Sequence, residues 1–237
     1  AFAAVGAGLE ACRRILRRGA TPAVLRLYDE VESERSFAVA GRAVLIVLDE
    51  GDPGLVDAVM TVVSEECASA ERLDTSLADR WFAHRNEIPG LDGLLRAGLI
   101  VDTIEVAASW AALPAVYDAA VDGLRALDGT VAASGHQSHA YTDGACLYFT
   151  FAGRPPPDEA DEYYRRAWRV VMAATVASDG AISHHHGIGL NRGEQLADAL
   201  GSAFDVLRVL KDALDPSGVL NPAKLGLPSP FGPPPWP

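Results

Sequence analysis

Apolar residues recur along this chain with two spacings, one typical of helices and one typical of strands. Residues 43–48 (AVLIVL) form the most continuous apolar run and predict a buried strand, and residues 99–108 alternate as in a strand with one buried face. Further strands are expected at residues 23–28, 130–136 and 145–152. Helices are expected at residues 7–18, from Pro53 onward, and at 114–127, 158–178 and 193–214. Residues 74–98 follow neither spacing clearly.

The order of these elements predicts the fold class. Helices and strands follow one another as α-β-β-α-β-α-β-β-α, and then come a loop and another helix. This order favours an α+β fold in which helices cover one face of a mainly antiparallel sheet. We expect a lobe of residues 1–179, a helical arm of residues 180–225, and a proline-rich tail of residues 226–237 that is not packed against the rest.

Composition narrows the class of partner. The chain has 237 residues, of which 49% are hydrophobic, so it is long enough to bury a sizeable core. Its 20 basic and 32 acidic residues leave a net charge of −12, which disfavours binding to nucleic acid. Three cysteines without CxxC spacing are typical of a reducing compartment, and no apolar run approaches the roughly 20 residues of a membrane-spanning helix. We therefore expect a cytoplasmic protein without a transmembrane segment.

A run of histidines is the outstanding candidate for chemistry. His184, His185 and His186 are three of the six histidines, and Gly187 follows them directly. Imidazole exchanges protons near neutral pH, and glycine lets the backbone approach a flat ligand closely. The alternative is a surface loop whose histidines only form hydrogen bonds. Adjacent residues rarely supply three ligands to one ion, and the loop holds no carboxylate, so no metal site is expected.

Two further segments carry candidate residues. In the strand expected at residues 145–152, Tyr148 and Cys146 share one face, and a tyrosine there exchanges protons if its pKa is lowered. Asn221 and Lys224 follow the last expected helix. From spacing alone, a core tyrosine is somewhat favoured for the first segment, and a turn-rich helix end is favoured for the second.

Taken together, the segments SHHHGIG, YTDGACLYF and DPSGVLNPAKL resemble the C-terminal half of FAD-linked oxidases of the vanillyl-alcohol oxidase type, and most of all the alkylglycerone-phosphate synthases of ether-lipid synthesis. Residues 22–30 (PAVLRLYDE) resemble the point where such proteins leave their flavin domain. The likeness runs from about residue 2 to 225. It implies a substrate-binding cap, residues 1–179, followed by an arm that packs on the flavin domain. The glycine-rich loop that holds the FAD pyrophosphate in this family is not found in this sequence.

The resemblance also implies roles for individual residues. Tyr148 matches the acid/base tyrosine of the synthases, and His184, His185 and His186 match their essential histidine run beside the flavin ring. There a substrate carbon loses a proton and becomes attached to flavin N5, and a fatty alcohol then replaces a fatty acid. The cofactor is expected to be FAD. The residues expected to contact it are His185, His186, Gly187, Asn221 and Lys224, and those expected to contact substrate are Leu91, Tyr148 and Arg192.

One position departs from the synthase pattern. An arginine that grips the acid group of the substrate stands in the family where this chain has Leu91. A leucine would make that wall of the pocket apolar and favour a neutral or differently placed substrate.

Two other functions remain open. A relative that oxidises D-2-hydroxy acids is one, and some of these bind a metal through two histidines and a glutamate. Here His139 offers one such ligand, but Cys146 and Tyr148 lie where the second histidine is expected and His185 replaces the glutamate, which weakens that interpretation. The other is a non-catalytic remnant or a subunit that completes a separate flavin protein. We expect a small-molecule or lipid-like substrate, a flavin-binding domain in cis or in trans, and a homodimer.

Overall fold

A five-stranded antiparallel sheet forms the centre of the protein, whose computed structural model describes residues 1–86 and 92–233. The spatial order is β2-β1-β4-β5-β3, and every neighbouring pair of strands is antiparallel. The strands are β1 (Val24–Tyr28), β2 (Val44–Leu48), β3 (Ile100–Ser109), β4 (Thr130–Ala140) and β5 (Gly144–Gly153). The predicted antiparallel α+β fold is therefore confirmed.

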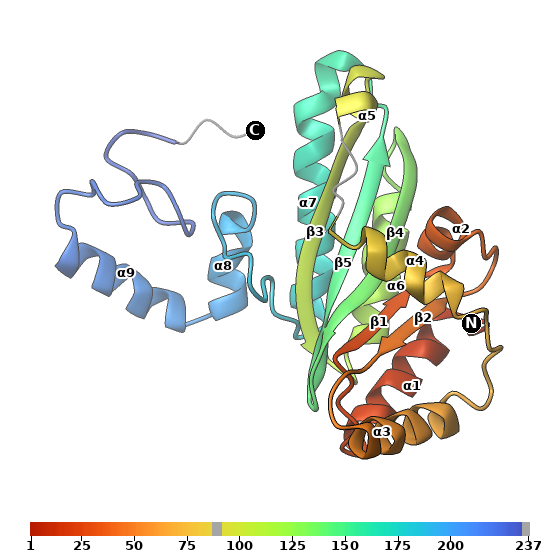
Figure 1. Cartoon of the computed structure of the whole chain (residues 1–237). Helices are drawn as coiled ribbons and strands as arrows, with labels where there is room; N and C mark the ends of the chain where they lie inside the picture. Colours follow the sequence, from red (N-terminus) through yellow and green to blue (C-terminus); the bar gives the residue numbers. More distant parts are fainter. Residues whose placement is uncertain (87–91, 234–237) are drawn as a thin grey trace.

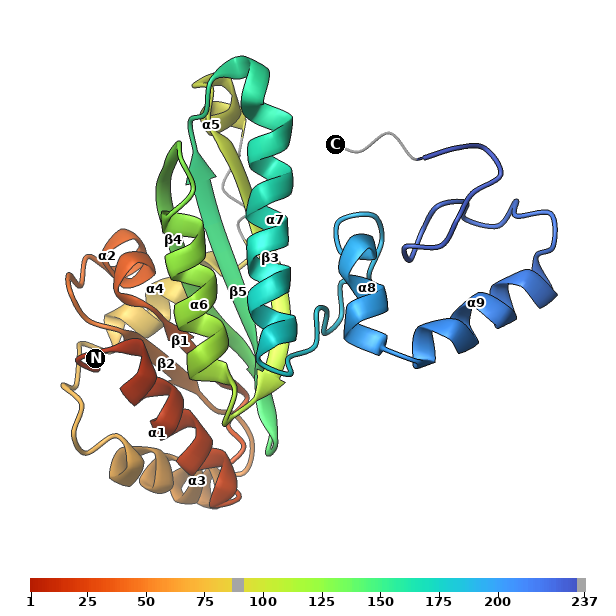
Figure 2. The same ribbon diagram turned by 180° about the vertical axis from the view of Figure 1, so that it is seen from behind.

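Three helices, α1, α6 and α7, cover one face of this sheet, as Figure 2 shows from behind. Figure 1 shows α4 on the opposite face and the arm of α8 and α9 extending away from the sheet. The helices are α1 (Val5–Arg17), α2 (Glu30–Phe37), α3 (Pro53–Glu66), α4 (Ser76–His84), α5 (Asp92–Arg96), α6 (Leu113–Arg125), α7 (Ala160–Ala177), α8 (Gly193–Leu200) and α9 (Ala203–Leu214). No helix in the described part of the chain combines the length and the apolar character that crossing a membrane requires.

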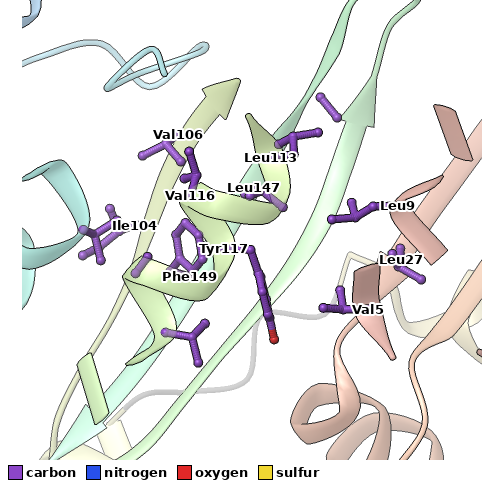
Figure 3. Close-up of a cluster of buried hydrophobic side chains, with 14 of the residues drawn as sticks. Val5, Leu9, Leu27, Ile104, Val106, Leu113, Val116, Tyr117, Leu147 and Phe149 are labelled. Carbon is purple, nitrogen blue, oxygen red and sulfur yellow. The ribbon is translucent and has the colours of Figure 1, made fainter. Parts of the chain in front are cut away.

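The main core lies between the sheet and these helices. Ile104 and Val106 of β3 and Leu147 and Phe149 of β5 are fully buried there, opposite Val116 of α6. Figure 3 shows these side chains between strand and helix. Full burial of each large apolar side chain contributes about 1.5–3 kcal/mol. The strand period of two therefore assigns alternate residues of β3 and β5 to the core.

A smaller apolar cluster lies on the other face, at β1 and β2. Tyr28, Phe37 and Ile46 are buried in it, and Trp81 of α4 packs against them. The indole Nε1 of Trp81 donates a hydrogen bond to the hydroxyl of Tyr28 at 2.6 Å. The sequence predicted helices on one face of the sheet only. In the structure, helices also cover the second face over β1 and β2.

The sequence analysis did not predict α2, which follows β1 directly. Asp29 is its N-cap, and the Asp29 carboxylate accepts the backbone N–H of Glu32. The helix has only eight residues and buries one large apolar side chain, Phe37, so no apolar period marks it. Its existence depends on the cap and on tertiary contacts.

The single helix predicted over residues 193–214 is wrong, because the chain breaks into α8 and α9. Gly201 ends α8 with φ 54° and ψ −131°, a conformation that glycine adopts far more easily than other residues. The tail also differs from its prediction, since Leu227 is buried. It lines a cavity of about 690 Å³ together with Trp168 of α7 and Phe204 of α9.

Candidate functional site

The candidate site lies on the sheet face opposite α6 and α7. Glu105 of β3 pairs with Tyr148 of β5, and Tyr148 pairs with His136 of β4. Residues directly opposite one another on neighbouring strands share a face, so these three side chains form one row across the sheet. The adjacent residues on these strands, such as Ile104 and Leu147, point to the opposite face and lie in the core.

The buried carboxylate of Glu105 fixes residues 183–189 (SHHHGIG), here called the histidine loop, above this row. The Oε1 atom of Glu105 accepts the backbone N–H of His184 at 2.7 Å and that of His185 at 3.1 Å. Just before the loop, the backbones of Ala107 and Ala181 exchange two hydrogen bonds, which bring residues 181–186 alongside β3. Burial opposes the ionisation of Glu105, but the two loop N–H groups, together with His186 and the thiol of Cys146, hold the pKa of Glu105 below its usual value. The carboxylate is therefore charged at neutral pH.

Glu105 was not among the predicted site residues. Its side chain is fully buried. The signal that would have found it is a lone glutamate in the apolar strand LIVDTIEVAA. An acid that a strand buries needs partners, and here they are the histidine loop and Arg192.

Arg192, which the sequence analysis expected to contact substrate, lies inside the protein. Its guanidinium is buried and donates to three backbone carbonyls, those of Ile182 at 2.7 Å, Glu105 at 2.9 Å and Gly187 at 3.1 Å. Its Nη2 also lies 3.5 Å from the Glu105 carboxylate. Arg192 therefore ties both ends of the histidine loop to β3 from inside the protein.

Tyr148 contacts the loop directly. Its hydroxyl lies 3.0 Å from Nε2 of His185, and its ring stacks on that of His136 with centroids 5.1 Å apart and planes 4° apart. Burial, together with the nearby Cys146 and Glu105, raises the pKa of Tyr148 to about 12. The sequence analysis required a lowered pKa for proton exchange; instead, the phenol is protonated at neutral pH and donates toward His185.

The histidines continue this hydrogen-bonded chain. The Nδ1 atoms of His184 and His185 lie 2.9 Å apart, so one donates and the other accepts. The contacts run without interruption from the Tyr148 hydroxyl through both nitrogens of His185 to His184. The rings of Tyr148 and His186 meet edge to face at 5.7 Å. The structure thus brings all four predicted catalytic residues together.

The remaining predicted residues lie at the margin of this site or beyond it. The segment with Asn221 and Lys224 approaches the end of the histidine loop, where the N–H of Leu225 donates to the carbonyl of Gly189 at 3.4 Å. Contact of Asn221 and Lys224 with a cofactor stays a prediction. Leu91 lies outside the described residues.

A second set of polar residues, which the sequence analysis did not select, extends the row. Nδ1 of His136 lies 2.9 Å from the buried carboxylate of Glu32, and Nε2 of His136 lies 2.8 Å from Nη2 of Arg26. Burial opposes the ionisation of Glu32, but the hydrogen bond from His136 contributes to a net lowering of the pKa of Glu32. Since arginine only donates, Nε2 of His136 accepts and its Nδ1–H donates to Glu32.

Four potential metal ligands also meet here. Ligand atoms of His139, Cys146, His184 and His185 all lie within 4.8 Å of one another, although no metal site was expected. Histidine and cysteine are zinc ligands, and burial lowers the pKa of His139, which keeps its ring in the neutral, metal-binding form. Burial and the Glu105 carboxylate, however, raise the pKa of Cys146, which opposes the thiolate that a metal requires. The set fits a metal in number and type, and the protonated thiol weakens it.

Fold, site and sequence agree on one family. Residues 1–225 match the family described as FAD linked oxidases, C-terminal domain, and the chain belongs to it. Its sequence is 29% identical over 232 residues to the uncharacterized FAD-linked oxidoreductase YgcU of Escherichia coli O157:H7, covering 90% of this chain and 48% of that protein. It is also 29% identical over 203 residues to alkyldihydroxyacetonephosphate synthase of Dictyostelium discoideum, covering 81% of this chain and 33% of the synthase.

Solved structures show the same fold. An alkyldihydroxyacetonephosphate synthase superimposes with a TM-score of 0.65 at 24% identity, covering 94% of this chain and 44% of that one. The 4-ethylphenol oxidase from Gulosibacter chungangensis, in complex with isoeugenol, superimposes with a TM-score of 0.66 at 12% identity, covering 96% and 52%. The chain therefore spans about half the length, or less, of the relatives it matches.

Proposed function

We propose that this chain is the substrate-binding half of an FAD-dependent enzyme of the alkylglycerone-phosphate synthase type, in which Tyr148 and the histidine loop move a proton at the substrate. The single observation that carries the proposal is the contact of 3.0 Å between the Tyr148 hydroxyl and Nε2 of His185. A tyrosine and an imidazole in hydrogen-bond reach of each other are a general acid/base pair. The similarity to a synthase and to an FAD-linked oxidoreductase supports the same conclusion.

The hydrogen-bond order defines how the pair works. Tyr148 Oη takes a proton from the substrate carbon while its own proton passes to Nε2 of His185. The proton on Nδ1 of His185 then shifts toward Nδ1 of His184, 2.9 Å away, so no charge stays on the phenol. Glu105 holds the backbone of both histidines and stabilises the positive charge that develops on them.

The exposed edge of the site fits a flat cofactor. The side chains of His185 and His186 are 41% and 44% exposed, and both rings lie next to the ring of Tyr148. An isoalloxazine ring lying against them would be within reach of Tyr148, and bound FAD supplies a ring that accepts electron density from the substrate. His185, His186 and Gly187 would contact that ring, and Asn221 and Lys224 would approach it from the arm.

The pyrophosphate of FAD needs a glycine-rich cradle that this sequence lacks, so another domain would hold it. The exposed apolar side chains of α9, Val206, Val209 and Leu214, support an arm that packs on that domain. We therefore propose a cap of residues 1–179 and a docking arm of residues 180–225. The flavin domain would come in cis or in trans, and a homodimer stays a prediction.

The test uses the chain joined to, or mixed with, its flavin domain. Tyr148→Phe should lower the rate of substrate-dependent flavin bleaching about 10²–10⁴-fold without changing the unfolding midpoint. His185→Ala should act likewise. Thr150→Ala is the matched control, because Thr150 lies on the same strand face and contacts Thr103 rather than the loop. An unchanged rate in Tyr148→Phe removes the tyrosine from the mechanism, and no turnover in any combination favours a non-catalytic subunit.

The set of four ligands favours one second candidate, an FAD-linked dehydrogenase of D-2-hydroxy acids that uses a metal. Elemental analysis of the purified chain decides between the two. One equivalent of zinc or manganese that is lost in Cys146→Ser and in His139→Ala supports the dehydrogenase. Metal-free protein with full activity after flavin loading supports the synthase-type chemistry.

A further inference from the structure

A cation that the proposed chemistry does not use lies next to the catalytic row. Arg26 of β1 sits on the same face as His136, and its Nη2 lies 2.8 Å from Nε2 of that ring. The Nε atom of Arg26 is buried and has no hydrogen-bond partner. Within residues 1–86 and 92–233, no carboxylate forms an ion pair with it. The guanidinium is therefore a cation without an acid partner in the described part of the chain.

The surroundings hold the guanidinium in a fixed position. Its central carbon lies 5.5 Å from the ring centroid of Tyr28 and 6.0 Å from that of Trp81, within the range of cation–π attraction. His136 contacts it from the side, and His136 is itself held by Glu32. A charged group ordered in this way loses little further entropy when it binds a ligand.

The other charges near the row already have partners. The Glu32 carboxylate accepts from His136, and the Glu105 carboxylate contacts Arg192 and the histidine loop. Leaving Arg26 half-buried without a counter-ion is unfavourable, and an acidic group from outside the chain would offset that. The only two lysines, Lys211 and Lys224, both belong to the arm. One guanidinium matches a singly charged carboxylate, which accepts two parallel hydrogen bonds from it.

The geometry also relates Arg26 to the proton-transfer pair. The His136 ring lies between them, stacked on Tyr148 with centroids 5.1 Å apart and bonded to Arg26 at its far nitrogen. The His136 ring therefore links Arg26 to Tyr148 along one face of the sheet.

We propose that Arg26, positioned by His136, binds the carboxylate of a small acidic substrate. This inference rests on the proposed function for the meaning of "substrate", but the binding site itself does not depend on flavin. It differs from the expectation of a neutral substrate that followed from Leu91, since a cation on a different strand would bind the acid group. Arg26 is then the specificity-determining residue of the site and His136 a positioning residue.

The experiment is an NMR titration of the 237-residue chain labelled with ¹⁵N, observed at the Nε–H of Arg26. Glycolate is the probe, glycolamide is its neutral control, and inorganic phosphate tests the competing anion. Glycolate should shift the Arg26 signal saturably, with a Kd on the order of millimolar, and glycolamide should not. Arg26→Gln, followed through the His136 ring signals, should weaken binding about 10–100-fold, and Arg26→Lys should weaken it less.

Arg42→Gln is the matched control, since Arg42 is an exposed arginine paired with Glu71 away from the row, and it should bind glycolate normally. An unfolding curve of Arg26→Gln that matches the parent chain shows that the variant is folded. The proposal is overturned if glycolate and glycolamide behave alike, if phosphate saturates the site at lower concentration than glycolate, or if Arg42→Gln weakens binding as much as Arg26→Gln. Saturable glycolate binding alongside an unaffected rate in Tyr148→Phe would keep Arg26 as the acid-binding residue and reject the proposed proton transfer.

Discussion

The two faces of the sheet are built from alternate residues of the same strands, and different kinds of interaction stabilise them. On β5, Leu147 and Phe149 point to the helices and are fully buried, whereas Cys146 and Tyr148 point to the histidine loop. The apolar face is stabilised by the hydrophobic effect, which does not depend on the direction of individual contacts. The polar face is held by hydrogen bonds and charges whose geometry must be satisfied atom by atom. Neighbouring residues should therefore respond very differently to substitution.

Phe149→Ala should give the largest loss of stability. The ring fills a fully buried position against Tyr117, so its removal should lower the free energy of unfolding by about 3–5 kcal/mol. Tyr148→Phe, one residue away, should change it by less than about 1 kcal/mol. Urea denaturation of both variants measures the difference. Equal losses would show that the open face contributes to the core as much as the covered face does.

Glu105→Gln should give the next largest effect and act mainly on the histidine loop. The neutral amide binds the loop N–H groups more weakly and leaves Arg192 buried without its counter-charge, so stability should fall by about 2 kcal/mol. Hydrogen exchange at the amides of His184 and His185 should accelerate more than at core amides. Uniform acceleration would mean that Glu105 supports the whole fold rather than the loop.

Acid should destabilise the polar face first. The pKa values of Glu105 and Glu32 are lowered in the folded protein, so their contribution is fully present above the unfolded-state value of about 4.3 and is lost as the pH falls through the folded values. Stability measured by urea denaturation should drop below about pH 4.5. The slope should be smaller in Glu105→Gln, and an identical slope in that variant would exclude Glu105 as its origin.

Leu214→Ser should have the smallest effect on stability. It tests the arm, in contrast to the substitutions in the sheet. Leu214 is 78% exposed on α9, so the substitution should change the stability of this chain by less than about 0.5 kcal/mol. If the arm packs on a flavin domain, the same substitution should weaken the association of the two halves measurably. Normal association would place the contact elsewhere on the arm.

Sequence reasoning reached the elements with strong periodicity and the residues in marked motifs. The strands at residues 43–48 and 99–108 were predicted from apolar pattern, and Tyr148 and the histidine run were predicted from resemblance. Glu105, His136 and Arg26 were missed, because the role of each depends on partners far away in the sequence. The burial of Arg192 was not predicted either, because its neighbours in sequence did not reveal the carbonyls that surround it.

By itself, the sequence determined the strands and the strongly amphipathic helices, the antiparallel α+β class and the family, because these depend on local spacing and on short motifs. Only the tertiary structure decided that Glu105 would anchor the histidine loop, that Arg192 would lie beneath it, and that Arg26 would stand beside His136 with no acid partner among the described residues. The physical reason is that a buried charge is defined by the groups that surround it, and strand pairing brings those groups together from distant parts of the chain.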